Sequence, residues 1–397
     1  MNTVAVICEY NPFHNGHEYH FKKIREKFGK DTAIVAIMSG NFTQRGEFAF
    51  APKDLRAKCA CLCGADLVLE LPFPFSSSSA EIFALSGVKI ADCLGFIDYL
   101  SFGSESGDID ALVRAATVYN SDEFDKALKD TLNNKKLGYP EIIELAFSRV
   151  SKDHLSFTPN NILAIEYIKA IKKLSSSIKP HTVKREGAGY NEESITDSRF
   201  QSASAIRNAF GSDNALDFIP TDTRSAIIKG RDDGELPTDI GRLSSAIISF
   251  FRLNPPSQNC DIQDAGDGLY NRIRNASFDA NDISSLIELS MAKNYTKARI
   301  KRAILNSFLG VTSSDVKALP KYTQVLAMNK IGMLLLKKAK VSDDFKILTK
   351  PSAFEDFAPE IKKQKLLSDK ADSIFELAKP IPKSGKLSLK LTPFVKK

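Results

Sequence analysis

The sequence lacks any long apolar run. Nowhere in its 397 residues do eighteen uncharged apolar residues follow one another, so no segment is expected to span a membrane as a helix. The first apolar run, residues 4–8, is too short for a signal peptide and is followed at once by Glu9. We therefore expect a cytoplasmic protein with no membrane association. Its 43% hydrophobic and 26% charged residues are typical of a globular chain large enough for two domains.

Cysteine is also scarce, with six residues in the whole chain, which argues against a secreted disulfide framework. Three of them form the stretch CACLC at residues 59–63. A metal site is one interpretation, but the paired CxxC spacing of zinc sites is missing, and on a helix Cys61 would not share a face with Cys59 and Cys63. Buried small apolar side chains are the favoured interpretation. We predict no protein-held metal site.

The charges are unevenly distributed. Residues 241–397 hold 27 Lys and Arg against 15 Asp and Glu, whereas residues 1–240 hold 28 against 33. A basic back half suggests a polyanionic partner such as nucleic acid, although lysine-rich solvated helices without a partner are also common. No protein partner is evident from the sequence.

The front half alternates short apolar runs with helix-like segments. Strands are expected at 4–8, 32–38, 66–71, 99–102 and 178–185, and helices near 17–28, 53–63, 79–93, 107–134, 160–174 and 202–210. The runs are too continuous for strands with one solvent-exposed face, so they indicate a parallel sheet that helices cover on both sides. The expected fold class is α/β, with a Rossmann-like parallel sheet.

After residue 241 the pattern changes to helices without obvious strands. The segment TKARIKRAILNSFLG (296–310) is amphipathic and strongly basic, and the Lys- and Pro-containing tail after residue 378 is ambiguous between a strand, an extended arm and disorder. We predict an α/β domain over residues 1–235 and a mainly α-helical, basic domain over residues 236–397.

Histidine is rare, yet three of the five histidines lie within the first twenty residues, in the stretch HNGHEYH. His14 and His17 follow the first expected strand and stand at the start of the first expected helix. In a parallel α/β sheet this is where nucleotides bind, and imidazole N–H groups can donate to phosphoryl oxygens as charge builds on them. The alternative is a histidine pair that merely caps the helix or packs in the core.

Several blocks in the front half together resemble the HxGH nucleotidyltransferase superfamily, and more narrowly the bacterial tRNA(Met) cytidine acetate ligases. The blocks are EYNPFHNGHEYH (9–20), MSGNFTQRGE (38–47), DLVLELPF (66–73), SFGSE (101–105), PNNILAIEY (159–167), KREGAGY (184–190) and SASAIR (202–207). The first two are far more distinctive than HxGH alone.

The resemblance implies a two-step reaction. ATP and acetate give acetyl-adenylate and pyrophosphate, and the acetyl group then passes to N4 of the wobble cytidine (C34) of elongator tRNA(Met). ATP is a substrate in this scheme, and Mg²⁺ is expected with it, although no acidic ligand pair stands out. The KMSKS loop of aminoacyl-tRNA synthetases is absent.

The resemblance also implies the site. His14 and His17 would be catalytic, and ATP would lie along Ile7, Cys8, Glu9, Tyr10, Asn11, Pro12, Phe13, His14, Asn15, Gly16, His17, Glu18, Tyr19 and His20, with contacts from Gly103, Asn161, Arg185, Ser202, Ser204 and Arg207. Plainer roles stay open: a strand-end turn at Gly103, a helix N-cap at Asn160, a surface charge at Arg185 and a simple capped helix at 202–207.

The remaining expectations concern acetate and RNA. Ser39 and Gly40 would border the acetate pocket, and tRNA would contact Gln44, Arg45, Lys297, Arg299, Lys301 and Arg302. Two other functions are also compatible with the motif: a small-molecule adenylyltransferase of cofactor metabolism, and an RNA-binding protein that senses a nucleotide without turning it over.

Overall fold

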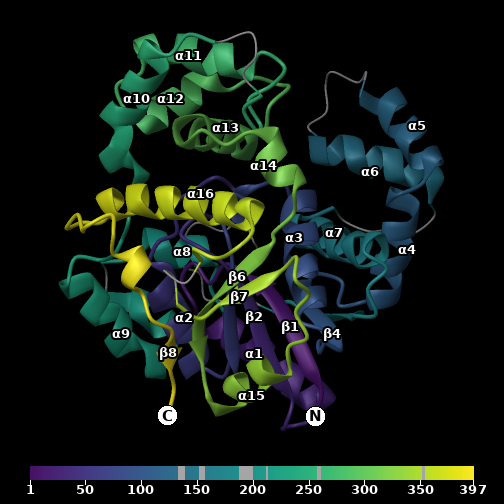
Figure 1. Ribbon diagram of the computed structural model, residues 1–397. Coiled ribbons are helices and arrows are strands. Elements are labelled where there is room, and N and C mark those ends of the chain that lie inside the picture. Colours follow the sequence, from purple (N-terminus) through teal and green to yellow (C-terminus); the bar gives the residue numbers. More distant parts are fainter. Residues whose placement is uncertain (133–138, 152–156, 187–199, 212, 257–260, 351–353) are drawn as a thin grey trace.

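The computed structural model describes residues 1–397 except 133–138, 152–156, 187–199, 212, 257–260 and 351–353. The strands are β1 (Thr3–Cys8), β2 (Ala33–Ser39), β3 (Leu67–Leu71), β4 (Tyr99–Ser104), β5 (Lys179–Lys184), β6 (Tyr322–Met328), β7 (Lys346–Leu348) and β8 (Phe394–Val395). They form one sheet with the order β5-β4-β1-β2-β3-β6-β7, in which β8 also pairs with β6 (Figure 1). β1 to β5 run parallel to one another, and β6 is antiparallel to its neighbour β3.

The α-helices of the described residues are α1 (Asn15–Phe28), α2 (Lys53–Leu62), α3 (Ala80–Cys93), α4 (Ile109–Tyr119), α5 (Asp122–Leu132), α6 (Tyr139–Val150), α7 (Pro159–Lys173), α8 (Ala203–Asn208), α9 (Thr221–Asp232), α10 (Ser244–Leu253), α11 (Leu269–Asp279), α12 (Ile283–Ser290), α13 (Lys297–Leu309), α14 (Ser313–Lys317), α15 (Lys330–Lys338) and α16 (Pro359–Phe375). None of them is both long and apolar enough to cross a membrane.

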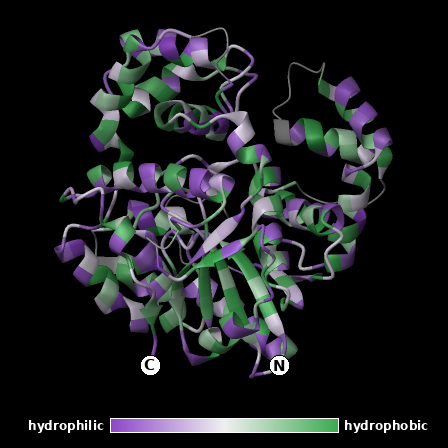
Figure 2. Cartoon of the chain, in the orientation of Figure 1, coloured by the Kyte–Doolittle hydropathy of each residue, from purple (hydrophilic) through white to green (hydrophobic). Residues whose placement is uncertain are grey.

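Helices cover both faces of the parallel strands, as predicted. Along β1, Ala5 and Ile7 pack into a core with α3, α4 and α7, whereas Val4 and Val6 pack into a second core with α1, α2 and α9. Successive side chains of a strand point to opposite faces, so a strand buried on both sides must be apolar throughout. Figure 2 shows these strands as an almost continuous hydrophobic block.

One expected helix is in fact two. The span 107–134 is interrupted between α4 and α5, where the Ser121 hydroxyl oxygen accepts the backbone N–H of Phe124 at 3.2 Å. A serine at this position competes with helix continuation by capping the next helix. Cys59 and Cys61 are buried within α2 and Cys63 is half-buried, which agrees with the interpretation of CACLC as small packed side chains.

Helices α10 to α13 share a separate apolar core and gather above α16 in Figure 1. The back half is mainly helical, as expected, but β6 and β7, where the sequence shows no obvious strand, join the sheet of the front half. β8 lies in the tail, for which a strand was one alternative. The division at residues 235/236 stays a prediction, and the sheet draws strands from both sides of it. β6 escaped detection because polar residues interrupt its apolar pattern. The hydroxyl of Thr323, for example, is buried and donates to the Glu70 carbonyl oxygen at 2.6 Å.

A buried ionic cluster joins α16 to the catalytic sheet. The Lys53 ammonium donates to Glu70 Oε1 at 2.7 Å and to Asp372 Oδ2 at 2.6 Å, and all three side chains are at most 3% exposed. The Asn41 side chain donates to Asp372 Oδ1 at 2.9 Å and so ties the loop after β2 to the same cluster. Burial acts to lower the pKa of Lys53, but its two carboxylate partners raise it overall, so the ammonium stays charged.

Candidate active site at the first strand-to-helix loop

The HNGH stretch forms the N-terminus of α1. His14 is the N-cap, and its Nδ1 accepts the backbone N–H of Gly16 at 3.1 Å. His17 Nδ1 in turn accepts the backbone N–H of His14 at 3.2 Å. A Cβ at position 16 would lie 2.9 Å from His14 Cε1, so glycine leaves room for the ring to fold back over the first turn. The motif is therefore a reciprocal capping box made of two imidazoles.

These contacts fix the tautomers. Because Nδ1 of each ring accepts a hydrogen bond, a neutral ring carries its proton on Nε2. Burial, together with Arg185 and Arg207, lowers the pKa of His14 to about 3. Burial, followed by the neighbouring His14, lowers the pKa of His17 well below its usual value. Both imidazoles are thus neutral N–H donors near pH 7, with ring centroids 3.8 Å apart.

A cavity of about 650 Å³ opens beside the two rings at the carboxyl ends of β1 and β4. Of the residues expected around ATP, the cavity is lined by Ile7, Cys8, Glu9, Tyr10, Asn11, His14, His17, His20, Gly103, Arg185, Ser202, Ser204 and Arg207. Residues separated by about 200 positions in the sequence therefore surround one space, and this volume falls within the range of ligand pockets.

Other residues expected to contact ATP do not line the cavity. Phe13 is buried in the core of α1, the Tyr19 hydroxyl donates to Glu186 Oε1 at 2.6 Å, and the Asn15 side chain donates to the Asp217 carbonyl oxygen. Pro12, Gly16 and Glu18 do not line the cavity either. These residues shape the loop and the helix start around the lining residues.

The PNN stretch places its two asparagines differently. Asn160 lines the cavity, and its side chain donates to Glu105 Oε1 at 2.6 Å. Asn161 is buried behind it, where its Oδ1 accepts the backbone N–H of Glu105 at 3.2 Å. The alternative of an N-cap at Asn160 is wrong, because the Thr158 hydroxyl caps α7. Asn160, rather than Asn161, thus lines the cavity.

Arg185 and Arg207 bring two guanidinium groups to the cavity. A Cβ at Gly103 would lie 3.2 Å from Arg185 Cγ, so the bare strand end admits the Arg185 side chain. Arg207 donates to the Asn11 carbonyl oxygen at 2.7 Å and to the Ser204 hydroxyl at 3.1 Å, which ties α8 to the first loop. Ser202 is the N-cap of α8, so the capped-helix role coexists with its place on the cavity wall.

The loop after β2 and the start of α13 form the opposite wall. Gln44, Arg45, Glu47, Lys297 and Lys301 all line the cavity. The cavity thus collects five Lys and Arg side chains against two carboxylates, Glu9 and Glu47, which suits a polyanionic ligand. Sequence reasoning missed Thr43 and Glu47 here, and the Phe102 and Tyr167 rings on the other side, because ordinary core or loop residues give no local signal.

The two arginines of α13 are turned away from the cavity. Arg302 is buried and donates to Asp264 Oδ2 at 3.0 Å, and Arg299 donates to Asp267 Oδ2 at 2.8 Å. Both ion pairs hold α13 against the turn at residues 264–267. Because its guanidinium is buried and paired, Arg302 is poorly placed for the tRNA contact expected of it.

The expected acetate residues are also displaced. Ser39 and Gly40 do not line the cavity, and their carbonyl oxygens accept hydrogen bonds from the buried Arg56 guanidinium. A Cβ at Gly40 would lie 2.5 Å from Glu70 Oε1, so the glycine makes room for the buried ionic cluster. Both residues therefore lie behind the cavity wall, and the acetate contact expected of them stays a prediction.

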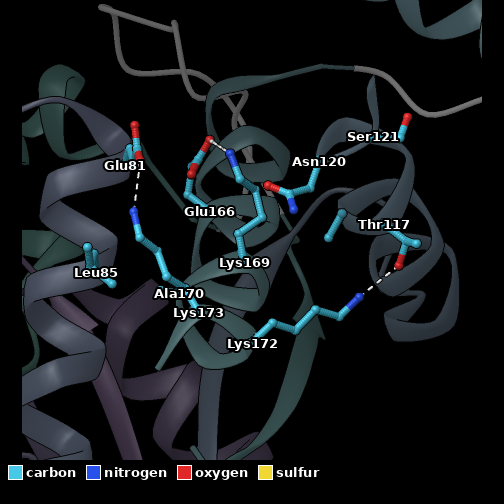
Figure 3. A pocket seen from close by; sticks show the side chains of 11 residues that line it. Glu81, Leu85, Thr117, Asn120, Ser121, Glu166, Lys169, Ala170, Lys172 and Lys173 are labelled. Atoms are coloured by element: carbon cyan, nitrogen blue, oxygen red, sulfur yellow. Dashed lines mark hydrogen bonds and ion pairs between the residues drawn. The ribbon is translucent and has the colours of Figure 1, made fainter. Parts of the chain in front are cut away.

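A second cavity, of about 660 Å³, lies between α3, α4 and α7 and shares no lining residue with the first. Figure 3 shows its lysines projecting from α7. Lys169 pairs with Glu166 at 3.1 Å, Lys173 with Glu81 at 3.6 Å, and Lys172 donates to the Thr117 hydroxyl at 2.8 Å. Its charges are therefore largely satisfied within the groove, in contrast to the cationic excess of the first cavity.

The parallel sheet, the cavity at the carboxyl ends of its strands and the paired imidazoles define an α/β nucleotidyl-transferring protein. The family model of the HIGH nucleotidyl transferases matches residues 1–388. A tRNA(Met) cytidine acetate ligase of Caldanaerobacter subterraneus is 37% identical over 89% of this chain and 90% of its own, and one of Acetivibrio thermocellus is 35% identical over 92% of both. The chain belongs to the tRNA(Met) cytidine acetate ligase family of HIGH nucleotidyl transferases, which confirms the resemblance seen in the sequence blocks.

Solved structures agree. Thermotoga maritima TmcAL bound with alpha-thio ATP aligns with a TM-score of 0.85 and 31% identity over 100% of this chain and 99% of its own. The apo form of the same protein aligns with a TM-score of 0.88 over the same shares. The expected α/β fold class is thereby confirmed.

Proposed function

We propose that the protein joins acetate to ATP as acetyl-adenylate and then transfers the acetyl group to N4 of the wobble cytidine (C34) of elongator tRNA(Met). The product is N4-acetylcytidine. The observation that carries this proposal is the pair of neutral imidazole N–H donors, His14 and His17, in a cavity with a cationic excess. The shared name of the relatives and the ATP analogue bound to the Thermotoga protein support it.

In the first step an acetate oxygen attacks the α-phosphorus, the bond to the bridging oxygen breaks, and pyrophosphate leaves. A carboxylate needs no general base for this attack, so the protein has to position the reactants and stabilise the developing charge. We assign that stabilisation to the N–H groups of His14 and His17. The nucleotide lies along the lining residues of the 7–20 segment and beside Gly103.

We assign binding of the β- and γ-phosphates to the other cationic side chains that line the cavity. Arg185 and Arg207 supply guanidinium groups, and the hydroxyls of Ser202 and Ser204 lie beside Arg207 at the start of α8. Asn161 acts through its buried contact with Glu105 rather than by touching the nucleotide.

The second step needs RNA beside the adenylate. The cytidine amine is a poor nucleophile because its lone pair is delocalised into the ring, and a mixed anhydride is a suitably activated acetyl donor. We assign the approach of the anticodon loop to the wall of Gln44, Arg45, Lys297 and Lys301, whose cations suit backbone phosphates. We propose a cytoplasmic location because such a substrate is found there.

Mg²⁺ is part of the proposal as the companion of ATP. The described residues contain no group of three or more His, Cys, Asp or Glu side chains suited to hold a metal ion. Mg²⁺ prefers to keep several waters and to bind phosphate oxygens. We therefore propose that it enters bound to the triphosphate.

The test is to incubate the purified protein with ATP, Mg²⁺, acetate and elongator tRNA(Met), and to search the digested tRNA for N4-acetylcytidine by mass spectrometry. Exchange of labelled pyrophosphate into ATP that depends on acetate follows the first step alone. Exchange driven only by another acid would favour a small-molecule adenylyltransferase, and RNA binding without any exchange would favour a nucleotide-sensing protein.

A further inference from the structure

Two carboxylates stand in the cationic cavity, and they are held differently. Glu47 forms an ion pair with Lys301. The Oε1 atom of Glu9 accepts the backbone N–H of Gln44 at 2.8 Å, and its Oε2 accepts no hydrogen bond from the described residues. A carboxylate beside phosphates is unfavourable by charge alone, so its presence in this cavity calls for a chemical role.

We propose that Glu9 is the general base of the acetyl-transfer step and takes the proton that the cytidine amine loses. The inference rests on the proposed function, because only an amine acceptor needs such a base. Attack by the amine forms the N–C bond, and the bond between the acetyl carbon and the phosphate oxygen breaks with its electron pair leaving on AMP. The N4 proton passes to the Glu9 carboxylate and from there to water.

The position of Glu9 fits this role. It directly follows β1, five residues before His14, and so shares a loop with the phosphate donors. Its hydrogen bond to Gln44 turns the carboxylate toward the wall of Gln44, Arg45, Lys297 and Lys301, from which we expect the RNA to enter. Glu9 therefore lies between the histidines that we assign to the α-phosphate and the wall from which we expect the RNA.

The other basic groups of the lining are less suited. Nδ1 of His14 and Nδ1 of His17 are occupied by backbone N–H groups, which leaves these rings as donors. His20 shares its Nε2 with the Ser101 hydroxyl at 2.8 Å, and burial and the neighbouring His181 lower its pKa to about 3, too low to hold a proton at neutral pH. Burial opposes ionisation of Glu47, yet its ion pair with Lys301 lowers its pKa overall.

The surroundings of Glu9 make its carboxylate a better proton acceptor. Burial raises its pKa and outweighs the opposing hydrogen bond from Gln44, and a general base works best with a pKa near the working pH. The charged and titratable groups that face it come from four elements: Cys8 at the end of β1, Arg45 and Glu47 in the loop after β2, Arg56 in α2, and Arg207 in α8. Of these, Glu47 raises the pKa of Glu9, and Arg45 and Arg207 lower it.

The experiment separates the two steps. Acetate-dependent pyrophosphate exchange measures adenylation, and a single-turnover reaction of enzyme-bound [¹⁴C]acetyl-adenylate with tRNA(Met) measures transfer. Glu9→Gln is isosteric and cannot accept the proton. It should slow transfer by about 100-fold more than it slows exchange, because only transfer needs a proton acceptor. Transfer by wild type should rise with pH to a plateau as Glu9 ionises, and this rise should vanish in Glu9→Gln.

Glu47→Gln is the matched control, since it removes the other carboxylate of the same cavity. It should change exchange and transfer by a similar factor and keep the pH profile. Glu9→Asp should retain part of the transfer rate, and it serves in place of Glu9→Gln if that variant is unstable. Equal loss of exchange and transfer in Glu9→Gln, or an unchanged transfer rate, would overturn the proposal. Absence of exchange in wild type would instead overturn the proposed function.

Discussion

His14 and His17 hold each other in place: His17 Nδ1 accepts the backbone N–H of His14 at 3.2 Å, and the two rings lie 3.8 Å apart. The same contacts cap α1 and direct the remaining ring protons to Nε2. A capping role and a phosphate-binding role, which looked like alternatives in the sequence, are therefore combined in one structure.

Because His14 has both roles, substitutions at this position can separate helix capping from phosphate binding. Asparagine is among the best N-cap residues, so His14→Asn should keep the thermal midpoint close to wild type, whereas His14→Ala should cost about 1 kcal/mol of stability. Both variants lose the Nε2 donor and should lower acetate-dependent pyrophosphate exchange by about 100-fold. Calorimetry and exchange assays check this. Full exchange activity in His14→Asn would show that His14 only caps the helix.

Neutral buried histidines also make stability depend on pH. The folded-state pKa values of His14 and His20 are lowered to about 3 from the ordinary 6.5. As the pH falls below about 6.5 the unfolded chain binds protons that the folded chain does not, so the free energy of unfolding decreases. Above this pH the histidines are neutral in both the folded and the unfolded chain, so they do not contribute to the pH dependence of the free energy of unfolding. Urea titrations at pH 5 and pH 8 should show the loss, and His20→Gln should show less of it; identical losses in the two proteins would contradict the assignment.

The fold was predictable where one residue type dominates locally. Apolar runs revealed β1 to β4, because strands buried on both faces must be apolar throughout, and β5 was placed between the helices around it. The sequence did not predict β6, because this strand buries two polar residues, Thr323 and Gln324. Thr323 is satisfied by a partner 253 residues away, at Glu70, a pairing that no local pattern reveals.

The functional site was likewise predictable from the sequence only in part. The first loop carries its own signature in HNGH, so its position was readable. The facing wall is assembled from distant segments, and four neighbouring basic residues of α13 differ in their surroundings: Lys297 and Lys301 reach the cavity, whereas Arg299 and Arg302 meet Asp267 and Asp264. The turn at 264–267 that decides this is about thirty residues earlier in the sequence.

The QRGE loop depends on a glycine pressed against α13. Gly46 has φ +76°, and a Cβ there would lie 2.5 Å from the backbone nitrogen of Arg302. Gly46→Ala therefore combines a strained backbone with a clash and should destabilise the fold by about 2–3 kcal/mol. Gly29→Ala is the control, since Gly29 has φ +103° and nothing within 4 Å of the added Cβ. Its cost should be about 1 kcal/mol, and equal costs at the two sites by chemical denaturation would exclude the clash.

The buried ionic cluster should be far more sensitive than a surface pair. Lys53→Met leaves Glu70 and Asp372 buried together without their cation and should cost about 3–5 kcal/mol. Lys229→Met breaks an exposed pair with Asp233 and should leave the thermal midpoint unchanged. Thermal denaturation of both variants tests the difference. Similar midpoints would mean that α16 is held to the sheet by other contacts.

The lysines and arginines of α13 should affect RNA binding in different ways. Lys297 and Lys301 line the cavity, and replacing both with Gln should weaken tRNA(Met) binding and reduce the slope of log affinity against log salt by about one unit for each lost phosphate contact. Arg302→Gln should instead lower the thermal midpoint, because it leaves the Asp264 carboxylate, whose side chain is only 9% exposed, without its cation. Filter binding over a series of salt concentrations, with thermal melts of the same proteins, checks both expectations. A reduced salt slope in Arg302→Gln at full stability, with a wild-type slope in the double lysine variant, would reverse the assignment and place the RNA on the far side of α13.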